Sequence, residues 1–459
     1  MWKKLVTVVL VLMVVSLAAC SSGGSSTGSG KKDTKKDKGL DPIGQTVKYD
    51  PNHLVNKGEP IDIEYWTWVD NDPAIALAKK YEKTYPNVKI KTVIQPWDDF
   101  WTKLPLALKG KNGPAIFNVH NSQNDLLMPY MAAYKIPVKD LEADFTSVPS
   151  HVVDGKIYYT DISINTGNIY YNKKLWKEAG LTESDIPKTW EEFTAVAKKL
   201  TKEKSGKITQ AGFNFNSETY SAMIEGLNYQ KGTLLFDKDG KKVNFDNKTA
   251  KENTQFLKDL YDKEKVGSKD FGTDSSQSFG NGQSAMVYKW GWYQGELKNK
   301  YPDIDYGVFP TPTPTKDTPF AYDRYNGEST PGINKNQTKE QQAVAQDFLK
   351  YLLANDDYSK QGALNLASFP TKKSLAKDKD ILADPVLKAL SNRIDRLIWP
   401  GAFPAVIEST STQTMEDVLY NGKSVDQALK DGQAKIDKEM AKSDFKASES
   451  KYKFYNEAN

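Results

Sequence analysis

The sequence predicts an α/β protein that contains two or three domains. The chain has 459 residues, of which 38% are hydrophobic and 11% aromatic, so it can bury a large core. Residues 61–94 follow the order strand, helix, strand with short joins, which is typical of an α/β unit. Residues 156–200 have a related order, with strand patterns followed by two helix patterns. Both stretches favour helices packed on sheets.

The first α/β unit begins at residues 61–68, which alternate with period two and predict a strand. Asp72 is expected to cap the next helix, with Pro73 in its first turn. Residues 74–85 are amphipathic and predict that helix, and residues 88–94 alternate again and predict the second strand.

A further buried strand is predicted at residues 115–120. In open α/β sheets ligands bind outside the carboxyl ends of the strands, so side chains at strand ends are candidates for ligand binding. These candidates are Trp66, Trp68, Asn118 and His120. The alternative for both tryptophans is packing in the core, and for His120 it is a hydrogen-bonded structural role.

The central stretch starts with residues 156–160, whose β-branched and aromatic side chains predict a short strand. Residues 161–168 carry Asp, Ser, Asn, Thr and Gly, which predicts an extended crossing or loop, and residues 169–171 predict a second short strand. Gly180 is placed to end the following helix, and Thr189 to begin another with a capping box.

Residues 170–193 resemble the extracellular solute-binding protein family 1 of ABC importers, the group that includes maltose-binding protein. In that family the pattern "YYN…L…AGL…P.TW.EF" opens the second lobe, and these residues match it in order and spacing. The resemblance implies an α/β, two-lobed, periplasmic-binding-protein-like type II fold. Each lobe would be a mixed sheet flanked by helices, with a hinge between the lobes.

A second resemblance lies at residues 279–293, which are similar to the family pattern "F..G.AAM…G.W". The tryptophan of that pattern stacks on the face of a sugar. By spacing from Met286 it is Trp292, and Trp290 is an additional aromatic residue. The alternative is that one of the two tryptophans packs against a helix of its own lobe.

The chain is then expected to return to the first lobe through a strand and hinge at residues 306–315. Tyr322 and Arg324 would line the cleft, and so would Trp399, which lies in an aromatic-rich stretch. Residues 418–429 are similar to the family's C-terminal pattern "vl.g..s.deAL", so the resemblance covers about residues 60–440.

Neither a metal nor a cofactor is expected. Residues 229–245 predict a hairpin with Asp239-Gly240 in its turn, and this turn lacks the later carboxylates of a calcium loop. The three histidines are far apart in sequence, and a single cysteine excludes an internal disulfide.

The N-terminal segment accounts for the basic character of the chain. Residues 1–39 have a net charge of +5 and the whole chain has +4, so residues 40–459 have a net charge of −1. The charge of the expected folded part therefore does not favour nucleic-acid binding. Residues 5–19 form an apolar stretch typical of a signal peptide. Leu17-Ala-Ala-Cys20 resembles a bacterial lipobox, which implies a lipid on Cys20; the alternative is an ordinary signal peptide with a chance cysteine.

The expected organisation follows from these patterns and from the resemblance. It comprises a signal peptide at residues 1–19, a flexible tether at 20–58, a first lobe at 59–165 and 320–360, and a second lobe at 166–319 and 361–459.

The expected function is capture of a sugar or an oligosaccharide for an ABC permease. Sugars need aromatic platforms and polar partners for their hydroxyls, and Asp161, Asn165, Arg324 and Asn118 are plausible partners. The resemblance implies a monomeric, lipid-anchored protein at the extracellular face of the bacterial cytoplasmic membrane. A peptide or polyamine ligand is the alternative within the family.

A secreted glycosidase is the alternative outside the family. It would need two carboxylates that flank the sugar, whereas Asp98/Asp99 and Glu191/Glu192 are expected at helix starts. The sequences 282–286 and 327–331 also break the GxSxG pattern of serine nucleophiles.

Overall fold

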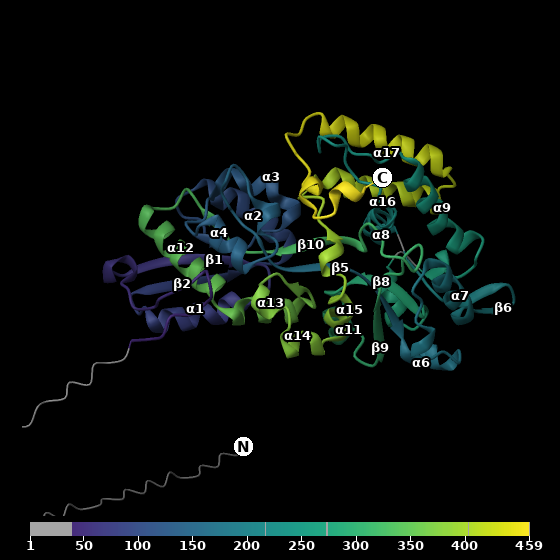
Figure 1. Ribbon diagram of the computed structural model, residues 1–459, viewed down its shortest axis with the longest axis horizontal. Coiled ribbons are helices and arrows are strands. Elements are labelled where there is room, and N and C mark those ends of the chain that lie inside the picture. Colours follow the sequence, from purple (N-terminus) through teal and green to yellow (C-terminus); the bar gives the residue numbers. More distant parts are fainter. Residues whose placement is uncertain (1–38, 216, 272–273, 403, 459) are drawn as a thin grey trace, which may run out of the picture. The chain divides into compact units, whose positions relative to one another are not determined.

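The computed structural model describes residues 39–215, 217–271, 274–402 and 404–458 (Figure 1). The expected signal peptide, residues 1–19, and the expected lipidation site Cys20 lie outside these residues. From Leu40 onward the chain forms one compact unit with two large mixed sheets. Within the described residues, no helix has both the length and the apolar character needed to cross a bilayer.

The first sheet has five strands in the order β2-β1-β3-β11-β4. Strands β1, β2 and β3 are parallel, and β11 runs antiparallel to both of its neighbours. Because β11 comes from a distant part of the sequence, the returning chain completes the first sheet. The bounds are β1 Ile61–Thr67, β2 Val88–Ile94, β3 Ile116–Phe117, β4 Met131–Ala132 and β11 Gly332–Asn334.

The two faces of β1 contact different helices. Ile63 and Tyr65 are buried in a core shared with α1 and α12, whereas Trp66 packs on the other face with residues of α2. Alternation along the strand therefore places Trp66 and Trp68 on the α2 side, as the period of two predicts. The helices around this sheet are α1 Pro73–Thr84, α2 Trp97–Lys109, α3 Asn124–Leu127, α4 Val138–Asp144, α5 Val148–His151 and α12 Lys339–Ala354.

The second sheet is built around the long strand β5 (Asp161–Asn172), which is buried along its whole length. Its first half pairs antiparallel with β10 and β12, and its second half pairs antiparallel with β8 and β9. β5 therefore continues through the crossing between the lobes (Figure 1). The other strands are β8 Met286–Trp290, β9 Tyr306–Pro310, β10 Asp323–Ser329, β12 Phe369–Pro370 and β13 Leu397–Ile398, and a separate pair is β6 Lys202–Lys204 with β7 Lys207–Gln210.

The prediction for residues 156–171 is confirmed in part: residues 169–171 lie in a strand and residues 161–168 are extended, but the strand at 156–160 and the loop alternative at 161–168 are wrong. Residues 156–160 form no strand, and residues 161–168 are not a loop but the first half of β5. Thr166 pairs with Tyr325 and Asn165 pairs with Asn326. The ladder with β10 satisfies the backbone of these polar residues, so their weak strand preference is overridden.

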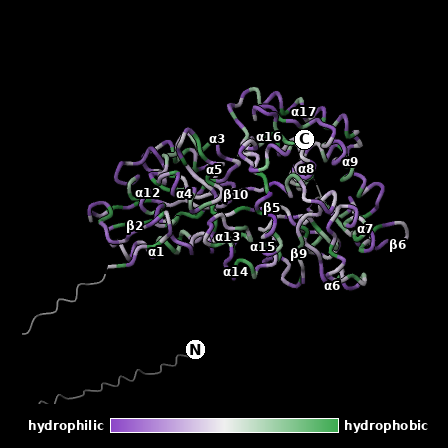
Figure 2. The backbone as a smooth tube through the Cα atoms, in the orientation of Figure 1, coloured by the Kyte–Doolittle hydropathy of each residue, from purple (hydrophilic) through white to green (hydrophobic). Residues whose placement is uncertain are grey.

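Helices cover the second sheet and include the capping box that the sequence predicts. Thr189 accepts a hydrogen bond from the backbone of Glu192 (3.2 Å), and the Glu192 carboxylate accepts one from the backbone of Thr189 (3.2 Å). Figure 2 shows that the outer helix α17 is largely hydrophilic. The helices are α6 Lys173–Glu178, α7 Trp190–Leu200, α8 Ser217–Gln230, α9 Lys248–Asp262, α10 Ser275–Gly280, α11 Tyr293–Lys300, α13 Asp356–Leu366, α14 Lys379–Ala383, α15 Pro385–Leu390, α16 Ala405–Leu419 and α17 Val425–Met440.

The flexible tether predicted for residues 20–58 is too long at its C-terminal end. Val47, Tyr49 and Val55 are buried in the core of the first lobe. The backbone of Val47 donates to Asp144 (2.8 Å), and the Tyr49 hydroxyl donates to Asp347 (2.7 Å). These partners are distant in sequence, so the local composition of residues 40–58 does not reveal the packing.

Candidate ligand-binding cleft

One wall of the candidate site is a group of aromatic rings at the carboxyl end of β1. The ring of Trp68 lies 5.1 Å from that of Trp97, 5.2 Å from that of Trp101 and 6.3 Å from that of His120. We call these four residues the aromatic cluster. Trp97 and Trp101 are one helical turn apart at the start of α2, and the Trp97 side chain is 42% exposed. Ring faces at such a position can stack on an apolar ligand surface.

Trp97 and Trp101 were not among the residues predicted from the sequence. Their spacing of four places them on the same side of α2, just after a strand, and this pattern could have identified them. The indole nitrogen of Trp101 is buried and has no hydrogen-bond partner among the described residues.

His120 and Asn118 are held by neighbours within the first lobe. The amide of Asn118 donates to Thr67 (2.8 Å) and to Asp72 (2.9 Å), so it ties the end of β1 to the N-terminus of α1. The imidazole of His120 lies 2.7 Å from the hydroxyl of Ser122. Burial lowers the pKa of His120 below its usual value, which favours the neutral ring at pH 7.

A second wall of the candidate site is organised around Arg324 of β10. This strand belongs to the second sheet, so the expectation that residues from 320 onward lie in the first lobe is wrong at Arg324. The Nε of Arg324 lies 2.6 Å from a carboxylate oxygen of Glu225 in α8, and a guanidinium nitrogen lies 3.8 Å from Glu408 in α16. The guanidinium carbon lies 5.0 Å from the centre of the Trp290 ring, which is a cation–π geometry. We call Arg324, Trp290, Glu225 and Glu408 the arginine cluster.

The two walls are close enough to influence each other electrostatically. The charge of Glu408 acts to raise the pKa of His120 against the larger effect of burial. On the second wall, burial raises the pKa of Glu225 to about 7 although Arg324 opposes this shift. Burial raises the pKa of Asp323, next to Arg324, to about 8. Arg324 therefore lies next to two buried carboxyl groups, those of Glu225 and Asp323, whose pKa values burial raises.

Two further predicted site residues, Asp161 and Asn165, are buried side chains on β5. One oxygen of Asp161 lies 2.8 Å from Nε2 of His151, and the other has no hydrogen-bond partner among the described residues. Asn165 accepts a hydrogen bond from the backbone of Gly291 (2.8 Å), which links β5 to the turn between Trp290 and Trp292. Both predicted polar residues are thus buried and engaged with other parts of the protein.

The remaining predicted site residues differ in exposure. Trp292 is 44% exposed, and the Nζ of Lys289 lies 5.8 Å from the centre of its ring. Trp399 is only 6% exposed, and its ring stacks on that of His151 at 4.4 Å. Tyr322 contacts the guanidinium of Arg393, 4.4 Å from its ring centre. Trp66 is partly buried and donates to Glu64 (2.8 Å).

The structure thus brings together several of the residues predicted from the sequence. The ring of Trp68 lies near that of His120, and the guanidinium of Arg324 lies over the ring of Trp290. His151 contacts both the carboxylate of Asp161 and the ring of Trp399. Glu225 and Glu408 were not predicted, because no local sequence pattern shows that a glutamate on a helix contacts a distant arginine. Contact of these residues with a ligand stays a prediction.

Comparison with known proteins identifies the family. Residues 66–358 match the family model described as bacterial extracellular solute-binding protein. The chain belongs to this family. The predicted resemblance is therefore confirmed over most of the chain.

Several characterised relatives of this solute-binding protein are similar along much of its length. An arabinooligosaccharide-binding protein of Bacillus subtilis is 26% identical over 331 residues, covering 66% of this chain and 72% of the relative. The diacetylchitobiose binding protein DasA of Streptomyces coelicolor is 27% identical over 458 residues, covering 96% of this chain and 99% of the relative.

Solved structures establish the fold. A cyclic alpha-maltosyl-1,6-maltose binding protein from Arthrobacter globiformis aligns with a TM-score of 0.68 at 21% identity, covering 84% of this chain and all (100%) of that chain. UgpB from Mycobacterium tuberculosis, solved with glycerophosphocholine, aligns with a TM-score of 0.69 at 16% identity, covering 83% and 99% of the two chains. The predicted two-lobed α/β fold class is therefore confirmed.

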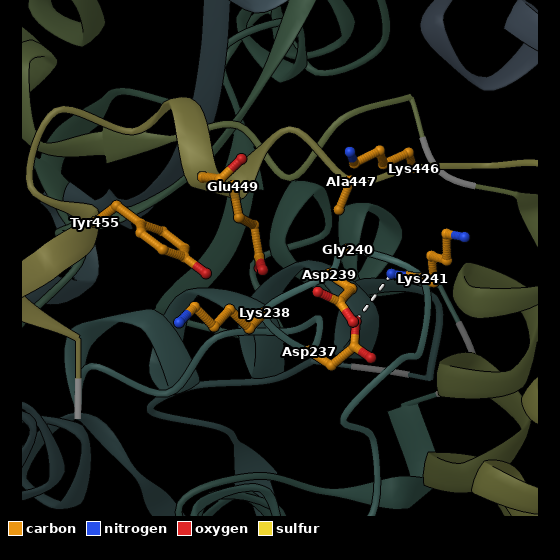
Figure 3. Close-up of a pocket in the computed structure, with 10 residues that line it drawn as sticks. Asp237, Lys238, Asp239, Gly240, Lys241, Lys446, Ala447, Glu449 and Tyr455 are labelled. Carbon is orange, nitrogen blue, oxygen red and sulfur yellow. Dashed lines mark hydrogen bonds between the residues drawn. The ribbon is translucent and has the colours of Figure 1, made fainter.

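The predicted hairpin of this solute-binding protein forms a separate pocket of about 340 Å³ with the C-terminal segment (Figure 3). Its turn is at Asp237–Gly240, and Phe236 pairs with Val243. The Asp237 carboxylate accepts hydrogen bonds from the backbones of Lys241 (2.9 Å) and Lys242 (3.1 Å). Within the described ranges, no group of three or more histidine, cysteine or acidic side chains is arranged to hold a metal ion.

Proposed function

We propose that this solute-binding protein captures a sugar or an oligosaccharide for an ABC importer. The named relatives that bind arabinooligosaccharides and diacetylchitobiose support this ligand class, since both match the chain over most of its length. Neither is named for a peptide or a polyamine, which makes those ligands the weaker alternative.

The observation that carries the proposal is the pairing of two unlike walls. Sugars present apolar ring faces and many hydroxyl groups, so a site for them needs aromatic surfaces next to charged or polar groups. The aromatic cluster supplies the first, with Trp97 most exposed, and the arginine cluster supplies the second. Glu225 holds the guanidinium of Arg324 in place, and the exposed Glu408 can accept hydrogen bonds from hydroxyls.

The capture step is closure of the two lobes over the ligand. β5 and β10 run side by side through the crossing, so a small change in their twist would move one wall toward the other. The ligand stabilises the closed arrangement because only there do both walls contact it. The permease would then recognise the closed form.

The chain is proposed to bind its ligand without cleaving it. A glycosidase needs two carboxylates free to act on the sugar, whereas the buried carboxylate of Glu225 lies against the guanidinium of Arg324. Incubation with chromogenic glycosides of arabinose, glucose and N-acetylglucosamine should give no colour. Turnover that is lost on Glu225→Gln would overturn the binding-only assignment.

We also propose that the mature protein is a monomer tethered outside the cell through a lipid on Cys20. The lipobox-like residues and the Gly/Ser-rich segment after them support this arrangement. The full chain expressed in a bacterial host should incorporate labelled palmitate and stay with the membrane fraction. Cys20→Ser should abolish both properties, and a variant that remains labelled would refute the anchor.

The test of the ligand class is intrinsic tryptophan fluorescence of the fragment that begins at Leu40, where the compact unit starts. It is titrated with arabino-, chito- and malto-oligosaccharides and then with short peptides. One sugar series should produce saturable quenching. Trp97→Ala and Trp292→Ala should each weaken binding about tenfold, which corresponds to about 1.4 kcal/mol.

The matched control is Tyr420→Ala, which removes an aromatic ring of similar exposure, 40%, at the end of α16. Its affinity should equal that of the unmodified fragment. A response to peptides with none to any sugar would overturn the carbohydrate assignment.

A further inference from the structure

A groove of about 840 Å³ lies beside the two walls, and it is separate from the residues discussed above except for His151 and Trp399. One side is formed by residues of the first lobe, including Asn124, Met128 and Tyr158. The other is formed by residues of the second lobe, including Val406, Lys442 and Phe445. We call it the lateral groove. Figure 1 shows that α3 lies near the segment before α16, and residues of both line the groove.

On each side of the lateral groove, the lining residues follow or precede residues of the candidate site closely in sequence. On the first lobe, His120 of the aromatic cluster leads directly into a short 3₁₀ helix (Asn121–Gln123) and then into α3, which starts at Asn124. On the second lobe, Glu408 of the arginine cluster lies two residues after Val406, in the first turn of α16. The first turns of α3 and α16, which border the groove, therefore lie close in sequence to residues of the aromatic and arginine clusters.

The floor connects the groove to the candidate site. His151 lines the groove and also binds Asp161, the buried acid at the start of β5. Tyr159 lines the groove and donates a hydrogen bond to Asn124 (3.0 Å), which fixes the first turn of α3 against the loop before β5. These bonds give the groove a preformed floor that does not depend on a ligand.

The lining has the composition of a site for an uncharged polar ligand. Tyr158 and Phe445 are partly buried aromatic rings on opposite sides, and each leaves ring surface available. Among the lining residues, three acidic side chains accompany two lysines, and Lys442 is already bonded to both carboxylate oxygens of Glu439 (2.9 Å each). The groove therefore offers no concentration of positive charge for a phosphate or a carboxylate ligand.

From this continuity and lining we infer that the ligand is a linear, uncharged oligosaccharide whose outer units leave the cleft past Trp399 and bind in the lateral groove. The inference rests on the proposed function, because it assigns the length and shape of the ligand for the same site. A volume of about 840 Å³ is at the upper end of the range for ligand sites, so the groove can hold more than one sugar unit. Tyr158 and Phe445 would serve as the stacking surfaces for those units.

The test is the dependence of affinity on chain length. The fragment from Leu40 is titrated with linear arabino-, chito- and malto-oligosaccharides from the mono- to the hexasaccharide, by calorimetry. In the series that binds, affinity should rise further beyond the length that fills the cleft alone. Tyr158→Ala and Phe445→Ala should each lower the affinity for the hexasaccharide about tenfold while that for the shortest binding sugar changes less than about twofold.

A blocking variant covers the case in which Tyr158→Ala impairs folding, since that ring also packs on the core of the first lobe. Val153→Trp places a large ring at an exposed position that lines the groove, and it should weaken only the long sugars. Tyr420→Ala, outside the groove, should change neither.

Equal affinity for the shortest binding sugar and the hexasaccharide, or groove variants that bind the hexasaccharide normally, would overturn the lateral groove as an outer subsite and leave the sugar-binding function intact. Absence of binding to any sugar of any length would overturn the proposed function itself. The two failures are therefore distinguishable in one set of titrations.

Discussion

Gly327 of β10 allows a close approach between two strands at the crossing, and replacing it with alanine tests the packing there. A Cβ at this position would lie closer than 3.0 Å to the carboxyl carbon and both oxygens of Asp161, a separation that Cβ atoms essentially never show. Asp161 is fully buried and cannot move away freely. The methyl group would therefore displace the carboxylate from its contact with His151 (2.8 Å).

The expected loss of stability combines two effects. Overpacking of a well-packed interior costs roughly 1–3 kcal/mol. Loss of a hydrogen bond to a charged group costs about 1.5–3 kcal/mol. Gly327→Ala should thus lower the free energy of unfolding by about 2.5–6 kcal/mol, measured by urea denaturation of the fragment from Leu40 and followed by circular dichroism.

The control is Gly295→Ala, because a Cβ at this position of α11 meets no atom within 4 Å. That variant should be stabilised by about 0.5–1 kcal/mol, the usual gain when alanine replaces glycine within a helix. In an Asp161→Ala background, Gly327→Ala should cost less than about 1 kcal/mol, since the atoms that clash are gone. An equal cost of Gly327→Ala in both backgrounds would refute the reasoning.

Three further predictions concern single side chains. Burial raises the pKa of Glu449 from 4.5 to about 7 in the folded state, so its contribution to stability should be complete below about pH 4.5 and be lost as the pH rises through 7. Glu449→Gln should flatten this part of the pH–stability curve. An unchanged slope would contradict the assignment. Asp72→Ala should cost about 2–4 kcal/mol in urea denaturation, because it removes the cap of α1 (2.8 Å to the Ala74 backbone) and the acceptor of Asn118, whereas Asp72→Asn should cost less. Thr189→Ala should cost about 1 kcal/mol through loss of the capping box, and a neutral effect would show that the box does not stabilise α7.

Local signals in the sequence predicted the helices and their ends well. Asp72 and Pro73 start α1, Thr189 starts α7, and Gly180 adopts a positive φ of 73° after α6, all as expected. These features depend on residues within one or two turns of each other, so a short stretch of sequence contains all the information they need. The period of two in β1 likewise predicted that Trp66 and Trp68 share a face.

The family resemblance predicted the fold class and part of the candidate site. It singled out Trp290 and Arg324, while the rule that ligands bind at strand ends singled out Trp68 and His120, and the structure brings these residues together in pairs. The resemblance did not predict the partner of Arg324, because Glu225 lies on a helix about a hundred residues away and looks like any other helical glutamate.

The sequence by itself therefore determined the family, the α/β class and the starts of α1 and α7, because each depends on contiguous residues. The tertiary structure alone decided that residues 161–172 form one continuous strand, since its pairing partner Tyr325 is far along the chain from Thr166. It also decided that the segment around Tyr49 packs on the first lobe and that Trp97 and Trp101 join Trp68. In each case the deciding contact joins residues distant in sequence, and no local pattern records such a contact.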